Sequence, residues 1–351
     1  MNQPIRWLKI LGFILVCSFI SHEASAVNVE LRIELQKRRK AIAEKMGQRG
    51  MLILFSPELR PYSGDVSYEF RQENNLFYLT GIRQREITLV LMPQNSSYRE
   101  ILFLPRRNPQ QELWNGQMLT AEEATEISGI EKVWSFSEFE PFLDSILYGR
   151  PYRTNHYTQS NEYQEFFKDL AEDQVTVFLL LQEKPGLTGE LNKEFQFGKQ
   201  IQERFPGIQI KDASKIFSQL RVVKSAYEIE QLKKAINITT EAQLNAIGRL
   251  RPGKWEYEIE AVIEYVFRKN NSFDWAFPSI VASGPNATIL HYEKSQRKTQ
   301  EGDLLLMDVG AEYNYYAADI TRTVPVNGQF TEEQRLIYQI VLDAQNAALL
   351  L

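Results

Sequence analysis

The sequence contains a single cysteine, Cys17, among its 351 residues, and it also lacks an excess of basic residues. One cysteine cannot close a disulfide within the chain, so disulfide-stabilised folds are excluded. The formal net charge of -5 leaves no basic surplus to neutralise phosphates, which disfavours a nucleic-acid partner. The fold must therefore depend on its apolar core and on the ligands that it binds.

Long hydrophobic runs are also scarce, and the clearest one lies near the start of the chain. Basic residues precede an apolar run from Ile10 to Ile20, and the small residues Ala24-Ser25-Ala26 follow it. This run is too short to cross about 30 Å of hydrocarbon, so a stable membrane anchor is disfavoured. The pattern predicts a cleavable signal peptide over residues 1–26 and export to the periplasm or the medium, with an uncleaved anchor or a buried element as alternatives. Cleavage would also remove Cys17, and with it all thiol chemistry.

Length and composition predict two soluble domains. Hydrophobic residues make up 43% of the chain and charged residues 24%, as in ordinary globular proteins. A chain of 351 residues also exceeds what one core usually holds.

Thr120 and Glu123 have the spacing of a capping box, which predicts a helix start. Apolar runs typical of strands lie at residues 51–55, 87–93, 100–105 and 175–181. Residues 27–220 are therefore predicted to form an α/β domain.

From residue 221 onward the pattern changes to longer helices. Ser225 and Glu228 form a second capping box, and Thr331 and Gln334 form a third. The first of these helices is predicted to end at residues 251–253, where Arg-Pro-Gly stops it. Helical spacing continues through Ile229, Leu232, Ile236, Thr240, Leu244 and Ile247. A second helix is predicted from Ile259, Val262, Ile263, Val266 and Phe267. Strands are predicted near residues 280–281, 289–292, 304–309 and 316–324. This order predicts an α+β layer in which helices cover one face of an antiparallel sheet.

Two aspartates stand inside the last two predicted strands. If residues 304–309 and 316–324 form a hairpin closed by residues 311–314, the symmetric register places Asp308 opposite Asp319. Opposed residues on antiparallel strands have β-carbons about 4.5 to 5.5 Å apart, where like charges repel. A divalent cation between the carboxylates would relieve that repulsion, which favours a metal site. The alternatives are an aspartate that points to solvent and a register slip that separates the pair.

His291 is the only histidine after residue 156. It lies in the predicted strand 289–292, near the acidic pair in the predicted sheet. A lone histidine on an apolar strand is more often a packed core residue than a catalytic one, so the residue pattern favours a structural role. A catalytic role remains the alternative.

Three segments of this half resemble aminopeptidase P, the Xaa-Pro aminopeptidase family of the pita-bread metallopeptidases. They are RVVKSAYEIEQLKKA (221–235), SGPNATILHYE (283–293) and EGDLLLMDVGAEYNYYAADITRTVPVNGQFTEEQ (301–334). The amino-terminal part is similar through YEFRQENNLFYLTGI (68–82) and ELWNGQMLT (112–120). The resemblance implies an α/β amino-terminal domain plus an incomplete α+β pita-bread domain over residues 221–351.

The resemblance also implies an activity and a set of site residues. The expected reaction is hydrolysis of the bond between an N-terminal residue and a following proline, by two divalent metal ions, manganese above all, that share a hydroxide. Asp319 matches the family's bridging metal ligand, Asp308 matches a ligand of one metal, and His291 matches a catalytic histidine on the substrate side. Expected partners are peptides with proline in second position and further copies of the chain. Trp114 is then a candidate subunit contact, although a structural tryptophan is the simpler interpretation.

The sequence departs from the family pattern after Asp319. The family completes its metal site with a histidine and two glutamates from a second half, whereas here 32 residues follow Asp319 and none is a histidine. We therefore expect the 351-residue chain alone to be inactive. Three interpretations remain: an Xaa-Pro aminopeptidase that needs more chain, a noncatalytic descendant used for binding or assembly, and a prolidase-like or creatinase-like hydrolase. The retained aspartates argue against a creatinase, which works without metal.

Overall fold

The computed structural model describes residues 29–95, 98–153, 160–181, 192–272 and 274–350. The predicted signal peptide over residues 1–26 lies outside these ranges. The chain divides into two compact units, Met1–Val223 and Lys224–Leu351. Within the described ranges, none of the helices combines the length and the apolar character needed to span a bilayer.

The first unit is built on a six-stranded mixed sheet with the order β6-β5-β4-β1-β7-β8. The four predicted strands are confirmed as β1, β4, β5 and β7, whereas β6 and β8 were not predicted because they are short and largely polar. In β1, every residue is buried, since successive side chains point into cores on opposite faces of the sheet. The strands are β1 (Gly50–Phe55), β4 (Thr88–Leu91), β5 (Glu100–Leu104), β6 (Lys132–Ser135), β7 (Thr176–Leu179) and β8 (Gln209–Asp212).

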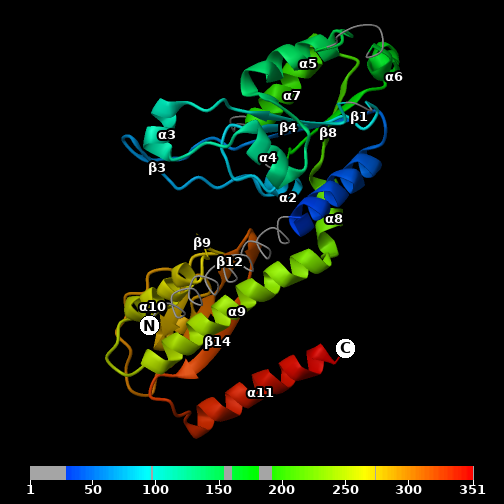
Figure 1. The fold of residues 1–351 in the computed structure, drawn as a ribbon. Coiled ribbons are helices and arrows are strands. Elements are labelled where there is room, and N and C mark those ends of the chain that lie inside the picture. The colour runs from blue at the N-terminus through cyan, green and yellow to red at the C-terminus, as the bar shows by residue number, and fades with distance from the viewer. Residues whose placement is uncertain (1–28, 96–97, 154–159, 182–191, 273, 351) are drawn as a thin grey trace, which may run out of the picture. The chain divides into compact units, whose positions relative to one another are not determined.

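Helices cover both faces of this sheet, as Figure 1 shows. One layer consists of α5 (Phe139–Leu147), α6 (Ser160–Ala171) and α7 (Lys193–Arg204). The other consists of the helix of residues 29–46, α2 (Asn74–Thr80), α4 (Ala121–Ser128) and α8 (Ser214–Val222). Smaller elements are β2 (Pro61–Ser63), β3 (Val66–Ser67), α3 (Pro109–Asn115) and η1 (Phe136–Glu138). The predicted capping box at the start of α4 is confirmed, because Thr120 and Glu123 exchange hydrogen bonds between side chain and backbone.

The second unit packs two helices on one face of a three-stranded sheet with the order β10-β11-β14. A second small sheet has the order β13-β12-β9. The predicted α+β layer is thus confirmed, and the predicted caps at Ser225 and Thr331 both form. The helices are α9 (Ala226–Arg249), α10 (Glu256–Lys269), η2 (Gly284–Thr288) and α11 (Glu332–Leu349). The strands are β9 (Asp274–Trp275), β10 (Ile280–Ser283), β11 (Leu304–Val309), β12 (Ala311–Tyr313), β13 (Tyr316–Ala317) and β14 (Ile320–Pro325).

The apolar stripe read from the sequence of α9 does not face the sheet. Ile236 and Leu244 are exposed, at 43% and 64% of their surface, whereas small and polar residues of α9 are buried. Thr239 Oγ1 accepts a hydrogen bond from Ala311 N at 2.9 Å, and Gln243 Nε2 donates to Ile320 O at 2.7 Å. The backbone of α9 therefore lies close to the strands, and hydrogen bonds join the helix to them.

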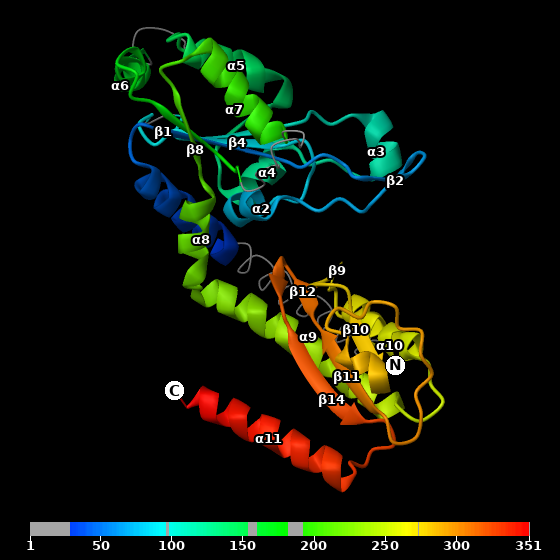
Figure 2. The same ribbon diagram turned by 180° about the vertical axis from the view of Figure 1, so that it is seen from behind.

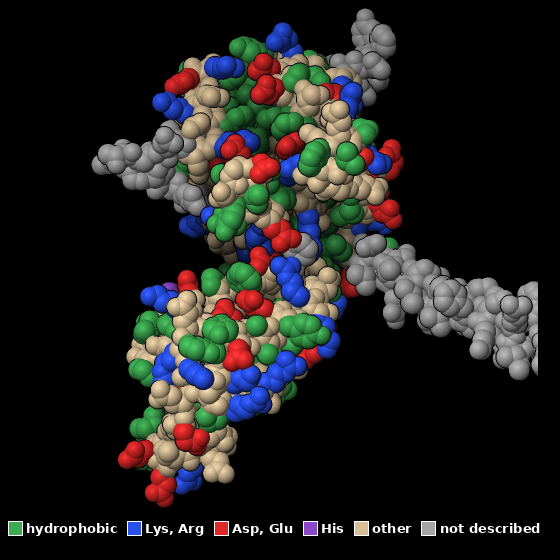
Figure 3. Space-filling model, turned by 90° about the vertical axis from the view of Figure 1, so that its left-hand side faces the viewer, with side chains coloured by type: hydrophobic (Ala, Val, Ile, Leu, Met, Phe, Trp, Pro, Cys, Tyr) green, Lys and Arg blue, Asp and Glu red, His purple; other side chains and the backbone are tan. Residues whose placement is uncertain are grey.

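The carboxy-terminal helix α11 exposes several of its apolar side chains. It lies beyond β14, away from α10 (Figures 1 and 2), and Gln334 Nε2 donates to Gly302 O at 2.9 Å. Ile337 is 62% exposed and Val341 is 63% exposed. The hollow between β14 and α11 is lined by Leu304, Thr321, Thr323, Ile337, Tyr338 and Val341. Elsewhere the surface is mixed: on the face drawn in Figure 3, acidic, basic and hydrophobic side chains are interspersed over both units.

Candidate metal centre and histidine turn

Asp308 lies near the end of β11, on the face of the sheet opposite to α9 and α10. Residues of this strand alternate between buried and half-buried, so Leu305, Met307 and Val309 point into the helical core and Asp308 points away. Its cross-strand neighbour on β14 is Thr321, whose Oγ1 donates to Asp308 Oδ1 at 2.8 Å. One oxygen of Asp308 is thereby held in a defined direction.

The predicted cross-strand pairing of Asp308 with Asp319 is wrong by two residues. The chain reverses at Asn314 and Tyr315, which both have positive φ (49° and 69°), and Tyr313 pairs with Tyr316. A two-residue turn of this kind matches the twist of the flanking strands. Because the turn lies later than the predicted one, Asp319 falls between β13 and β14 instead of within a strand.

A glycine nevertheless brings the two aspartates together. A β-carbon on Gly310 would collide with the backbone carbonyl of Ala318, so only glycine permits this approach of the two chain segments. Ala318 N donates to Ala311 O at 3.0 Å, which fixes this close approach of the two segments, the Gly310 crossing. Gly310 follows β11 directly and Ala318 precedes Asp319, so the crossing holds Asp319 beside the end of β11.

The negative charge of Asp308 acts on Asp319. Loss of hydration raises the pKa of Asp319 above its ordinary value, and the negative charge of Asp308 and a hydrogen bond with Asp308 raise it further. Neighbouring carboxylates repel each other, and a cation between them would relieve that repulsion. The repulsion expected from the sequence is therefore present. It arises at the Gly310 crossing and not from two aspartates that pair directly across two strands.

The donor atoms here fit a part of a divalent metal site. Carboxylate oxygens suit hard divalent ions such as Mn²⁺ and Mg²⁺. Among the described residues, however, no third histidine, cysteine, aspartate or glutamate joins the pair to make a ligand cluster. Two carboxylates do not fill the coordination shell of one such ion, so water or other donor groups would have to complete it.

The predicted strand over residues 289–292 does not form. These residues follow η2 in an irregular turn, where Ile289 is 51% exposed and Leu290 is 89% exposed. His291 is exposed as well, so the interpretation as a packed core residue is also wrong. Tyr292 is buried against Ile280 and Ala282 of β10. Because Ile280 pairs with Asp308 and Ala282 with Leu306, the turn that carries His291 packs on the sheet face that carries Asp308.

Sequence reasoning missed Glu256, which is completely buried at the start of α10. An acidic residue in the first turn of a helix is common, because it complements the helix dipole, so it gave no signal of another role.

In the first unit, Trp114 is 85% exposed, which excludes the interpretation as a buried structural tryptophan.

Comparisons with known proteins agree with this architecture. Residues 230–351 match the model of "Metallopeptidase family M24", and residues 35–155 match "Aminopeptidase P, N-terminal domain". The Xaa-Pro aminopeptidase of Escherichia coli K12 is 33% identical over 319 residues, which are 91% of this chain and 67% of the relative. That of Haemophilus influenzae is 32% identical over 316 residues, covering 90% of this chain and 66% of the relative.

Solved structures show the same relationship. Pseudomonas aeruginosa aminopeptidase PepP superimposes with a TM-score of 0.74 at 30% identity, covering 90% of this chain and 67% of that one. Zinc-substituted Escherichia coli aminopeptidase P in complex with product gives a TM-score of 0.74 at 30% identity, covering 91% and 68%. The fold is that of an M24 metallopeptidase domain preceded by an aminopeptidase P-type domain. The chain belongs to the Xaa-Pro aminopeptidase family, and it spans about two thirds of the length of the relatives that it matches.

Proposed function

We propose that the chain carries one part of the catalytic site of an Xaa-Pro aminopeptidase, which hydrolyses the bond between an N-terminal residue and a following proline. The observation that carries the proposal is the placement of Asp319 near Asp308 in the M24 portion: Asp308 pairs with Thr321, two residues beyond Asp319, and Ala318 approaches Gly310 closely. The names of the relatives support the reaction, since both are Xaa-Pro aminopeptidases.

In this proposal Asp319 and Asp308 would hold the divalent ions, and their carboxylate oxygens suit manganese as they suit magnesium. Such ions, when bound, supply Lewis-acid activation of the scissile carbonyl. Thr321 Oγ1 donates to one oxygen of Asp308 and so holds this carboxylate in a defined direction. The repulsion between the two carboxylates favours a cation between them at neutral pH.

We assign His291 to the substrate. Its imidazole is exposed, in a turn that packs on the face of the sheet carrying Asp308. From that position it can donate a hydrogen bond to the reacting peptide group. A dedicated contact is useful because the nitrogen of a peptide bond before proline carries no hydrogen for the enzyme to recognise.

Export and self-association belong to the same proposal. The apolar run of residues 10–20 followed by small residues supports secretion. The exposure of Trp114 and of its neighbour Leu113, at 85% and 83%, supports an interface between copies of the chain in the first unit.

The test is an assay of the native gene product, purified from its source, on three peptides that share the first residue. Release of that residue from an Xaa-Pro tripeptide, increased by Mn²⁺ and absent for an Xaa-Ala tripeptide, supports the proposal. Preference for the Xaa-Pro dipeptide would indicate a prolidase instead. Asp319→Asn should abolish turnover, and full turnover in this variant would contradict the assigned role. Asp343→Asn is the matched control, because Asp343 lies on the exposed surface of α11.

A further inference from the structure

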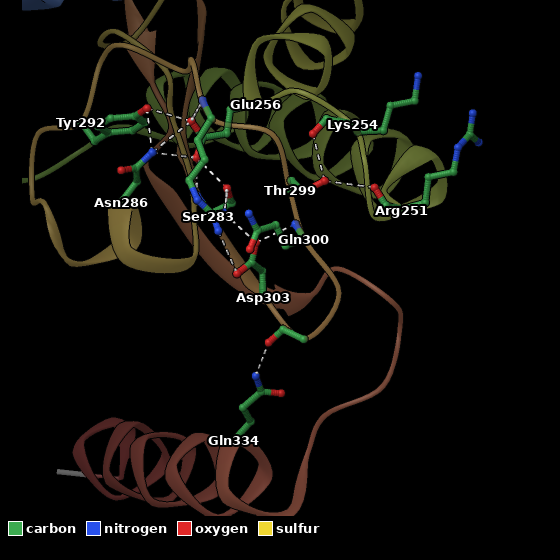
Figure 4. A network of polar contacts seen from close by, with 12 residues as sticks. Arg251, Lys254, Glu256, Ser283, Asn286, Tyr292, Thr299, Gln300, Asp303 and Gln334 are labelled. Atoms are coloured by element: carbon green, nitrogen blue, oxygen red, sulfur yellow. Dashed lines mark hydrogen bonds and ion pairs between the residues drawn. The ribbon is translucent and has the colours of Figure 1, made fainter.

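Glu256 is a buried carboxylate at the centre of a hydrogen-bond network (Figure 4). It is 0% exposed, and a buried carboxylate is tolerated only where hydrogen bonds replace its hydration. Oε1 accepts hydrogen bonds from Ser283 N at 2.6 Å and Ser283 Oγ at 2.7 Å. Oε2 accepts from Arg297 N and from the Tyr292 hydroxyl, both at 2.8 Å. Asn286 Nδ2 approaches both oxygens, at 3.2 and 3.3 Å.

The partners of Glu256 enclose the turn that carries His291. Ser283 is the last residue of β10, Asn286 lies in η2, and Tyr292 is the next residue after His291. Asn286 Nδ2 also donates to the Tyr292 hydroxyl at 2.8 Å, so the two ends of the turn are joined to each other as well as to Glu256. One carboxylate therefore fixes the backbone on both sides of His291.

An ion pair closes the network at the start of the turn. The Arg297 guanidinium pairs with Asp303, and its Nη1 donates to Ser283 Oγ at 2.8 Å. Gly284 has φ of +52°, and a β-carbon there would meet Asp303 Oδ1 at 2.6 Å. The chain thus leaves β10 along a left-handed path that glycine favours, and Glu256 and Arg297 hold it there.

The tip of the turn has no comparable support. Leu290 is 89% exposed, and no hydrogen bond within the described part of the chain involves the His291 imidazole. The direction of His291 is thus set by its backbone, and that backbone is anchored through Ser283, Asn286 and Tyr292. We propose that Glu256 is the positioning residue of His291: it binds both ends of the 284–292 turn and so presents the imidazole to the sheet face that carries Asp308. The inference rests on the proposed function for the role of His291, but not for the anchoring itself.

The anchoring can be measured without turnover. The chain has only three histidines, so the ¹H–¹³C spectrum of the imidazoles of the 351-residue protein is simple, and His291→Asn assigns the signal of His291. In Glu256→Gln, the amide NH2 would face the N–H donor of either Ser283 or Arg297, so one side of the anchor breaks. We expect the His291 signal to shift or broaden while the other two stay in place. An unchanged His291 signal in a folded Glu256→Gln protein would overturn the inference.

Two further variants, Tyr292→Phe and Glu256→Asp, keep the test decisive if Glu256→Gln does not fold. Tyr292→Phe removes only the hydroxyl contact at the His291 end, and we expect a smaller change of the same signal. Glu260→Gln, one turn further along α10, is the matched control and should leave all three signals unchanged. If neither Tyr292→Phe nor Glu256→Asp alters the His291 signal, the anchoring role is wrong.

Kinetics of the native gene product separate this inference from the proposed function. Misplacing a reacting group by 1 Å costs on the order of 100-fold in rate, so Glu256→Gln should lower kcat by about tenfold to 100-fold with little change in KM. Glu256→Asp should recover part of the loss. If Glu256→Gln moves the imidazole signal but His291→Asn leaves turnover intact, the anchoring stands and the proposed role of His291 fails.

Discussion

The backbone carbonyl of Ala318 occupies the place that a side chain on Gly310 would need. This crossing lies between the end of β11 and Asp319, and it brings the carboxyl of Asp319 to that of Asp308. The acidic pair thus depends on a glycine that carries no chemistry of its own.

Gly310→Ala should therefore separate the acidic pair. The obstacle is backbone, which cannot rotate away as a side chain can, so we expect a loss of about 2 kcal/mol in unfolding free energy. Mn²⁺ binding should weaken together with stability. Denaturant unfolding and a Mn²⁺ titration measure the two effects.

The matched control is Gly248→Ala within α9, where a β-carbon meets nothing within 4 Å. Alanine is favoured over glycine in a helix by about 0.5–1 kcal/mol, so this variant should be slightly more stable than the wild type. If Gly310→Ala also left stability and Mn²⁺ binding unchanged, the crossing would not be what holds the pair.

Glu256 should make stability depend on pH. Burial pushes its pKa up, but hydrogen bonds from Arg297 N, Ser283 and Tyr292 outweigh burial and hold the pKa below the usual value. A carboxyl with a lower pKa in the folded state stabilises the fold above its unfolded value of about 4.3, and this contribution is lost as pH falls through the folded value. Wild type should therefore exceed Glu256→Gln by roughly 1–3 kcal/mol at neutral pH and by less at pH 3.

Unfolding free energies across pH 3 to 7 test this dependence. Glu260→Gln serves as the control on the same helix and should follow the wild-type profile. A constant difference between wild type and Glu256→Gln over the whole range would show that Glu256 does not titrate with folding.

The sequence predicted the elements of the second unit better than their contacts. Ile236 and Leu244 of α9 lie on an apolar stripe, yet the sheet receives the face that carries Thr239 and Gln243. Periodicity identifies a helix, but it cannot choose between two faces when small residues allow closer packing on one of them.

Asp308 and Asp319 were identified as a pair, while their geometry depended on two features that spacing does not reveal. One is the left-handed turn at Asn314 and Tyr315, which displaced the register by two residues. The other is the crossing at Gly310. Glu256 was missed because its partners are close to it only in the folded chain, 27 to 41 positions away along the sequence.

The apolar face of α11 should make the purified chain associate. Ile337 and Val341 are exposed, and an exposed apolar face favours self-association. Ile337→Lys with Val341→Lys should lower the apparent mass in sedimentation, while stability changes by no more than about 0.5 kcal/mol because neither side chain is buried. The pair Gln339→Lys and Asp343→Lys, on the polar side of the same helix, is the control. Equal sedimentation of all three proteins would exclude this face as the contact.

The signal-peptide prediction is open to a direct mass measurement. The exported protein should begin at Val27, because small residues at positions 24 to 26 precede it as at a cleavage site. Peptide mapping of the amino terminus identifies the first residue. A protein that keeps Met1 and remains with the cell membrane would contradict cleavage and favour an anchor.

The most direct test of the account is Mn²⁺ binding by the 351-residue chain, followed through the loss of the free-ion electron paramagnetic resonance signal. We predict weak binding that falls roughly tenfold or more in both Asp308→Asn and Asp319→Asn, since loss of even an outer partner of a metal ligand costs about 10- to 100-fold. Asp343→Asn should bind as the wild type does. Equal Mn²⁺ binding by all four proteins would show that Asp308 and Asp319 do not form a metal site.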